Sequence, residues 1–318
     1  EENRRSGKLV FGHFDTTIEP SVGLGMFINP TAWFQNEEIE LGEVEQLSRD
    51  DYTSQLGGMI EQGPERSLLI IVHGYKEAFE SALRKTAFLS HVLDINTPVL
   101  VFDWPGNQGN TLRGYRRARQ VATDSGAELA ELLDVVTEQI KPERLWLVAN
   151  SMGAQVVVNA FETLYQESDW ADSERELENV VLTAPDVSTD EFTSRFKSQL
   201  MAFSKNLTVY MSSNDRALVV SRLVNRSTRL GESPVNPSQL EEAAHLFDLQ
   251  EPDRGLITLV DVTPVNRTRN FHNFSLETPE FFDDLYLRLL NHTTPQTRLR
   301  YRLLTPEGKV FWVLTQGR

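Results

Sequence analysis

Two kinds of hydrophobic pattern alternate along most of this chain. Short apolar runs bounded by polar or turn-forming residues are typical of strands that are buried on both faces. The runs are Leu68–Val72, Pro98–Phe102, Leu145–Asn150, Asn179–Ala184, Leu207–Met211 and Leu256–Val262. Between them, apolar residues recur at helical spacing over residues 77–93 and 115–140, after Gly153, after Ser188 and after Thr278. Strands that alternate with helices predict an α/β fold, in which helices cover both faces of a mostly parallel central sheet.

The N-terminal region and one internal stretch depart from this rhythm. Residues 1–65 are predicted to hold loops and two strands, at 8–14 and 38–45, of which the second is exposed and antiparallel. Gly57-Gly58 and Gly63-Pro64 predict a break after them. Residues 216–254 are polar and contain prolines, so we expect an excursion over one end of the sheet, a candidate lid.

The C-terminal tail predicts a β-hairpin around Pro306-Glu307-Gly308, with strands at 298–303 and 309–314. We therefore expect one domain over residues 1–318. Its parts would be the N-terminal strands and loops (1–65), a core (66–295) and the hairpin (296–318).

Ser151 follows the apolar run Leu145–Asn150, and a helical pattern opens at Gly153. A serine on a sharp turn between a strand and a helix is typical of a nucleophile elbow. The residues two before and two after such a serine must be small, as Ala149 and Gly153 are. The N–H of Met152 would then lie at the positive end of the helix, where it can bind a developing oxyanion. The alternative is an ordinary turn with a serine N-cap.

A serine nucleophile needs a base, and the base needs an acid that holds its tautomer; in this arrangement they follow in the order serine, acid, histidine. His272 follows the last strand of the predicted central sheet, Leu256–Val262, through a short loop, and we favour it as the base. Asp215 follows the strand Leu207–Met211, and we favour it as the acid over Asp186, which follows the preceding strand. Asp186 stays open as the alternative acid.

A second oxyanion donor is expected in the loop after the strand Leu68–Val72. There Gly74 lets the chain turn close to a substrate oxygen, so we expect the N–H of Tyr75 to be the donor, with Lys76 next. Gly74, Lys76 and Asn150 are the candidate pocket residues.

Composition narrows the partners of such a protein. The formal net charge of −15, from 31 basic and 46 acidic residues, argues against nucleic acid and anionic membranes. No apolar run approaches the ~18 residues of a membrane helix, and there is no cysteine for disulfides, thiol catalysis or metal ligation. The chain opens without methionine, so we expect that an upstream segment was removed. We expect a soluble protein of unknown compartment, and an exported or lipoprotein origin after removal of a leader stays open. Against the acidic background, four arginines crowd one helix start: Arg113, Arg116, Arg117 and Arg119. We expect a solvated surface there, with a site for phosphate or carboxylate as the alternative.

Several motifs together resemble the DUF900 group of α/β-hydrolases, bacterial serine-hydrolase-like proteins. The similar stretches are Val72–Tyr75, Phe102–Pro105, Asn150–Gly153, Ala184–Val187, Tyr210–Leu218, Arg229–Gly231 and the loop around His272. The resemblance covers roughly residues 68–290. It implies a three-layer α/β-hydrolase fold, with Ser151 as nucleophile, Asp215 as acid and His272 as base.

Three positions depart from that group. Asn150 stands where the family usually has histidine, Lys76 where it usually has asparagine, and Ala118 where an aspartate often follows Tyr115. The first two line the expected site, so a substrate preference is not carried over from the family.

The expected activity is that of a serine hydrolase, esterase- or lipase-like, which cleaves a small-molecule carboxylic ester through an acyl-serine intermediate. It needs no metal and no organic cofactor, and the pattern makes no prediction of oligomeric state. Two alternatives stay open: a catalytically silent binding or scaffold protein with the hydrolase fold, and an acyltransferase that uses the same triad.

Overall fold

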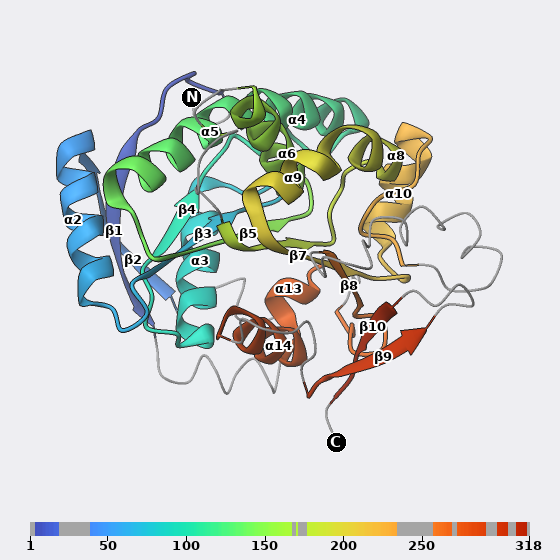
Figure 1. Cartoon of the computed structure of the whole chain (residues 1–318). Helices are drawn as coiled ribbons and strands as arrows, with labels where there is room; N and C mark the ends of the chain where they lie inside the picture. Colours follow the sequence, from blue (N-terminus) through green and yellow to red (C-terminus); the bar gives the residue numbers. More distant parts are fainter. Residues whose placement is uncertain are drawn as a thin grey trace.

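A computed structural model describes residues 4–18, 39–166, 170, 177–233, 257–268, 272–290, 298–304 and 310–316. Its main feature is an eight-stranded sheet in the order β4-β3-β5-β6-β7-β8-β10-β9 (Figure 1). The strands are β3 (Ser67–Val72), β4 (Val99–Phe102), β5 (Arg144–Asn150), β6 (Leu177–Thr183), β7 (Ser204–Met211), β8 (Ile257–Asp261), β9 (Arg300–Leu304) and β10 (Val310–Leu314). All neighbouring pairs from β4 to β10 run parallel, and only β9 runs antiparallel to its neighbour β10. The mostly parallel sheet predicted from the sequence is confirmed.

The register of the central strands brings their carboxyl ends to one edge of the sheet. Val72 of β3 pairs with Ala149 of β5, and Asn150 of β5 pairs with Thr183 of β6. The residues that follow β3, β5, β6 and β7 therefore meet at this edge, where parallel α/β sheets bind their ligands.

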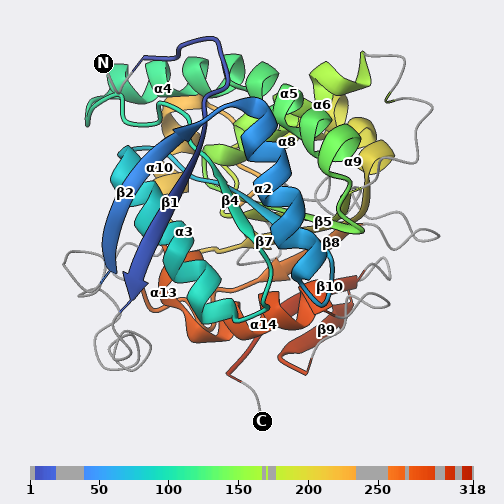
Figure 2. The same ribbon diagram turned by 90° about the vertical axis from the view of Figure 1, so that its left-hand side faces the viewer.

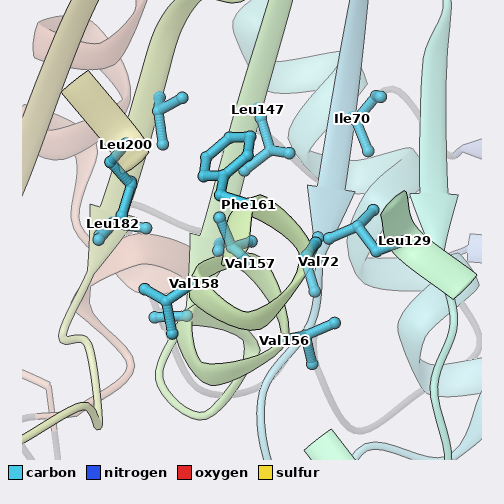
Figure 3. Close-up of a cluster of buried hydrophobic side chains, with 14 of the residues drawn as sticks. Ile70, Val72, Leu129, Leu147, Val156, Val157, Val158, Phe161, Leu182 and Leu200 are labelled. Carbon is cyan, nitrogen blue, oxygen red and sulfur yellow. The ribbon is translucent and has the colours of Figure 1, made fainter. Parts of the chain in front are cut away.

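Helices cover the two faces of the sheet (Figures 1 and 2). On one face lie α4 (Leu112–Asp124), α5 (Gly126–Val135), α6 (Gly153–Tyr165) and α9 (Lys197–Phe203); on the other lie α3 (Phe79–Leu93), α13 (Phe274–Glu277) and α14 (Pro279–Leu290). Each face has its own apolar cluster. Figure 3 shows the first cluster, where strand residues such as Leu147 meet Val157 and Phe161 of α6. This burial of apolar surface is the main stabilising term of the fold.

The single helix predicted over residues 115–140 is two α-helices and a final π-helical turn, η1 (Val136–Ile140). The break lies at Ser125 and Gly126. A Cβ atom at Gly126 would be 2.7 Å from the Cβ of Asn159, so α5 passes directly against α6. The close packing of α5 against α6 sets the boundary between α4 and α5. The spacing of apolar residues in the sequence does not predict this boundary.

The N-terminal region holds a separate two-stranded antiparallel sheet of β1 (Phe11–Ile18) and β2 (Ile39–Leu47). The antiparallel pairing was predicted, but the first strand begins three residues later than expected; the loop predicted between the strands lies outside the described residues.

The helix α2 (Arg49–Gln62) was not predicted. It buries Tyr52, Leu56 and Ile60 at helical spacing, and it tolerates Gly57-Gly58 because its burial against the fold outweighs the cost of two glycines.

The segment predicted as a candidate lid, residues 216–254, begins with a regular helix, α10 (Arg216–Asn225), and the part from 234 on lies outside the described residues. At the C-terminus β9 and β10 pair as predicted, and β10 also pairs in parallel with β8. None of the helices in the described part of the chain is both long and apolar enough to cross a membrane.

Candidate active site

Ser151 lies on a strained turn between β5 and α6. Its φ of +52° is in the left-handed region, which a residue with a side chain adopts only when its surroundings impose it. The surroundings are backbone hydrogen bonds: the Ser151 N–H donates to the Thr183 carbonyl at 2.9 Å, and the Ser151 carbonyl accepts from the N–H of Asp186 at 3.1 Å. The end of β6 therefore holds the turn on both sides of the serine.

Close backbone contacts explain why small residues surround the serine. A Cβ atom at Gly153 would be 2.5 Å from the carbonyl oxygen of His73 and 2.6 Å from that of Val72. At Gly74 it would be 3.2 Å from the Cβ of Ser151. The start of α6, the end of β3 and the serine are thus in contact, and a larger side chain at either glycine would separate them.

The side chains of Ser151, His272 and Asp215 form a continuous series of hydrogen bonds. Ser151 Oγ lies 2.9 Å from His272 Nε2, and His272 Nδ1 lies 2.7 Å from Asp215 Oδ2. Asp215 is also the N-cap of α10, because its Oδ1 accepts from the N–H groups of Ala217 and Leu218. An ionised carboxylate can only accept, so Nδ1 carries a proton and Nε2 is free to accept the serine proton.

The charge of His272 depends on its two acidic neighbours. Burial disfavours the imidazolium and by itself lowers the pKa of His272, but the hydrogen bond to Asp215 and the negative charges of Asp215 and Asp186 outweigh burial. The pKa of His272 is therefore raised above its ordinary value of 6.5.

Asp186 lies next to this series, with its carboxylate directed to other partners. Its Oδ2 accepts from the Tyr115 hydroxyl at 2.7 Å, its Oδ1 accepts from the Ser221 hydroxyl at 2.5 Å, and the guanidinium of Arg229 lies 3.4 Å away. Of the two acids considered from the sequence, Asp215 is the one that the structure brings to the imidazole nitrogen within hydrogen-bond distance.

The other histidines have other surroundings. His73 contacts Asp103 through Nε2 and stacks on Trp104, and exposed His13 lies 3.4 Å from Asp15. His91 is exposed in the last turn of α3. His245 and His292 lie outside the described residues.

The two backbone N–H groups expected to bind an oxyanion lie in the loops beside Ser151. In the described part of the chain, neither the amide of Met152 nor that of Tyr75 donates a hydrogen bond. The amide of Lys76 donates to the Gly106 carbonyl at 3.1 Å, so it is already used. The His73 ring also holds the Gly74 carbonyl, at 3.0 Å from Nδ1, and that carbonyl shares a rigid peptide unit with the Tyr75 N–H.

The remaining pocket candidates are less constrained. Lys76 is exposed, and its Nζ lies 5.4 Å from the centre of the Tyr75 ring. Asn150 is partly buried, and its Oδ1 is buried with no hydrogen-bond partner among the described residues.

The arginine cluster on α4 is divided by the structure. Arg119 points to α10 and α8 (Thr189–Glu191), where it donates to Asn225 and pairs with Glu191. The other three, Arg113, Arg116 and Arg117, are exposed.

Four residues of the site region were not selected from the sequence: Tyr115, Ser221, Arg229 and Glu232. Arg229 lies in one of the stretches that resemble the family, and Tyr115 was noted only beside the departure at Ala118, yet no spacing rule connects positions this far apart. Among the described residues, no group of three or more His, Asp or Glu side chains is arranged to hold a metal ion.

A family model matches most of this chain. Residues 48–285 match the model of a family described as alpha/beta hydrolase of unknown function, DUF900. No curated protein matches the chain. Among solved structures, the chain is similar to the ydeN gene product of B. subtilis (15% identity, TM-score 0.37, 70% of this chain and 98% of that one). It is similar to a putative hydrolase from Agrobacterium vitis S4 (12%, 0.39, 88% and 97%) and to the phospholipase PlaB from Legionella pneumophila (12%, 0.33, 78% and 68%).

Proposed function

This chain belongs to the DUF900 family of α/β-hydrolases, and on that premise we propose that it is a serine hydrolase that cleaves carboxylic esters through an acyl-serine intermediate. The observation that carries the proposal is the series of hydrogen bonds from Ser151 through His272 to buried Asp215, at 2.9 and 2.7 Å. These are the distances at which a base can take a serine proton and an acid can hold the base.

In the first half of the reaction, Ser151 Oγ attacks the ester carbonyl carbon while His272 Nε2 takes the hydroxyl proton. The carbonyl oxygen becomes an oxyanion, which the N–H groups of Met152 and Tyr75 would bind. When the intermediate collapses, the bond to the alcohol oxygen breaks, and His272 returns the proton to that oxygen. The products are a free alcohol and an acyl group on Ser151.

In the second half, water replaces the serine. His272 Nε2 takes a proton from water, the resulting nucleophile attacks the acyl carbon, and collapse returns the proton to Ser151 Oγ. The carboxylic acid leaves, and no net charge or electron is gained or lost. Asp215 keeps its charge throughout and stabilises the imidazolium in both halves.

The direct test is covalent labelling of the folded protein with a fluorophosphonate probe, followed by peptide mapping. We expect labelling at Ser151, and none in Ser151→Ala at the same probe concentration. Ser213, a nearby serine whose hydroxyl contacts Thr263, supplies the matched control: Ser213→Ala should label as the wild type does. A folded wild type that does not label at Ser151 would contradict the proposal.

A panel of chromogenic esters graded by acyl-chain length would then define the substrate. Esterase activity should be present in the wild type and absent in Ser151→Ala. If the acyl group were instead recovered on an added alcohol or thiol in preference to water, the protein would be an acyltransferase.

A further inference from the structure

A fully buried arginine lies beside the candidate active site. Arg229 has an exposed fraction of 0%, and its three guanidinium nitrogens make no hydrogen bond to any residue that the structure describes. Its ion-pair partner is Asp186, with Nε 3.4 Å from Oδ1, and the carboxylate of Glu232 accepts from the Arg229 backbone N–H at 3.1 Å. Burial lowers the pKa of Arg229, and the charge of Asp186 counteracts this. Such a pair is a poor source of stability, because the cost of removing both charges from water cancels much of their attraction.

The carboxylate of Asp186 is held by helices from two parts of the chain. Tyr115 of α4 and Ser221 of α10 both donate to it, and Tyr115 also contacts Ser221 at 2.8 Å. Burial and the nearby Asp186 raise the pKa of Tyr115 to about 12, so the phenol stays a donor. Because two hydroxyls donate to it, one to each oxygen, the carboxylate has a fixed place.

The backbone at Asp186 and next to Arg229 connects the parts of the triad. The N–H of Asp186 holds the carbonyl of Ser151 at 3.1 Å. Next to Arg229, the N–H of Leu230 donates to Val187, and the N–H of Gly231 donates to Pro185, while the Gly231 carbonyl accepts from Ser212 at 3.0 Å. Residues 229–231 therefore join the turn that supports the nucleophile to the loop that leads to Asp215.

The fit of this segment is tight. A Cβ atom at Gly231 would lie 2.6 Å from both the Ala184 carbonyl carbon and the Leu218 Cδ1. Ala184 itself has a φ of +44°, a second strained non-glycine residue beside Ser151. Two strained turns persist side by side only where the surrounding contacts hold them in place. The Asp186–Arg229 pair lies between the turn at 184–187 and residues 229–231, which make these contacts.

We propose, on the premise of the serine-hydrolase function above, that Asp186 and Arg229 are positioning residues for the triad. The buried pair locks the turn at 184–187 against residues 229–231, and so holds Ser151 and Asp215 at the spacing that His272 must bridge. The pair also sets the electrostatic potential at the His272 imidazole, where Asp186 contributes a negative charge and Arg229 partly cancels the effect of that charge. The other charged or titratable groups around the pair are Tyr115, Arg119 and Glu232, and His272 also faces Asp215.

The test uses Asp186→Asn, Arg229→Met and the double variant, with the rate of fluorophosphonate labelling at Ser151 measured against pH. Both single variants should label about tenfold more slowly at the plateau, because the triad spacing loosens. The pH midpoint should fall in Asp186→Asn and rise in Arg229→Met, each by about half a unit or more, because the two variants remove charges of opposite sign. In the double variant the midpoint should return to that of the wild type, with the plateau still low.

Arg117→Met is the matched control, since it removes an exposed arginine of the same helix, α4; its plateau and midpoint should be unchanged. A purely structural pair would give the same direction of change in both single variants. Equal midpoints and a wild-type plateau in folded variants would overturn the proposal.

A second measurement separates this proposal from the proposed function. The imidazole of His272, assigned with His272→Gln, can be titrated by NMR in each variant without any substrate. Suppose that the wild type does not label, but that the His272 pKa still moves in opposite directions in Asp186→Asn and Arg229→Met. Then the hydrolase function fails and the electrostatic role of the pair stands. If the titration is the same in all folded variants, the positioning proposal fails whatever the activity.

Discussion

At the scale of single residues, the site depends on groups that are each held by two interactions. Asp215 is the clearest example, because one carboxylate oxygen caps α10 and the other holds the His272 imidazole. The cap fixes the carboxylate before any substrate binds, so the imidazole keeps one tautomer. Ser151, in turn, is held by backbone bonds on both sides of a strained residue.

We predict that Asp215→Asn lowers kcat for ester hydrolysis by about 10³- to 10⁴-fold, because an amide favours the wrong imidazole tautomer. The N-cap is largely kept, since asparagine is also a good cap, so the free energy of unfolding should change little. Steady-state kinetics with a chromogenic ester, together with urea denaturation, checks both. Asp186→Asn leaves Asp215 unchanged, so its kcat should fall far less. A larger fall in Asp186→Asn than in Asp215→Asn would make Asp186 the acid.

The raised pKa of His272 predicts a pH profile. The base must be neutral, so kcat/KM should rise with pH through a midpoint above 6.5. The same shift has a consequence for stability. A folded pKa above the unfolded one means that the imidazolium stabilises the fold fully below about pH 6.5, and that this contribution is lost as pH rises through the folded pKa. The kinetic midpoint and an NMR titration of His272 should agree, and a midpoint below 6.5 in both would contradict the prediction.

At the scale of elements, glycines with the same local conformation have opposite roles. Gly153 opens α6 where a side chain would strike two carbonyl oxygens of β3 and its loop, whereas Gly57 lies in α2 with open space around its Cβ position. The difference cannot be read from helix propensity, because it depends on what lies across from each residue.

We predict that Gly57→Ala raises the free energy of unfolding by roughly 0.5–1 kcal/mol, since alanine is the better helix former and meets no neighbour. Gly153→Ala should instead destabilise the protein by about 1–3 kcal/mol and lower activity, because α6 must move away from β3. Urea denaturation of both variants, with kinetics for the second, gives the comparison. A stabilised Gly153→Ala with full activity would show that the close approach is not needed.

At the scale of the whole molecule, a buried polar network fastens the C-terminal strands to the sheet. Asp284 of α14 accepts from Tyr210 of β7 at 2.7 Å and from Arg300 of β9 at 2.9 and 3.0 Å, and both Asp284 and Arg300 are buried. This network links the last hairpin to the strand that leads to Asp215. It also explains how β9, with most of its residues exposed, stays in place.

We predict that Asp284→Ala costs about 3–5 kcal/mol of unfolding free energy, because it leaves a buried guanidinium without its carboxylate. The matched control is Glu162→Ala, which breaks the bidentate pair with half-exposed Arg195 and should cost about 1 kcal/mol or less. Chemical denaturation of the two variants decides this. Equal, small losses would mean that the C-terminal network does not hold the fold.

The main strands and the alternation with helices followed from the sequence alone, because apolar runs and helical spacing are local consequences of burial. The same local reasoning selected Ser151, Asp215 and His272 by their places after three of these strands, and the fold brings all three within hydrogen-bond distance of one another. It missed α2, since two glycines outweighed a helical pattern that only tertiary packing supports, and it joined α4 and α5, which are separated by a contact with α6.

Only the tertiary structure decided how Asp186 and Arg229 are used. The sequence left Asp186 as an alternative acid and gave no role to Arg229, because nothing local shows that Tyr115, Ser221 and Arg229 converge on one carboxylate from α4, α10 and the segment after it. The parallel pairing of β8 with β10 and the buried Asp284 network likewise depend on contacts between residues far apart in the chain. Local patterns determine which residues can be strand, helix or nucleophile; contacts between residues far apart in the chain determine which charges are paired and which side chains meet.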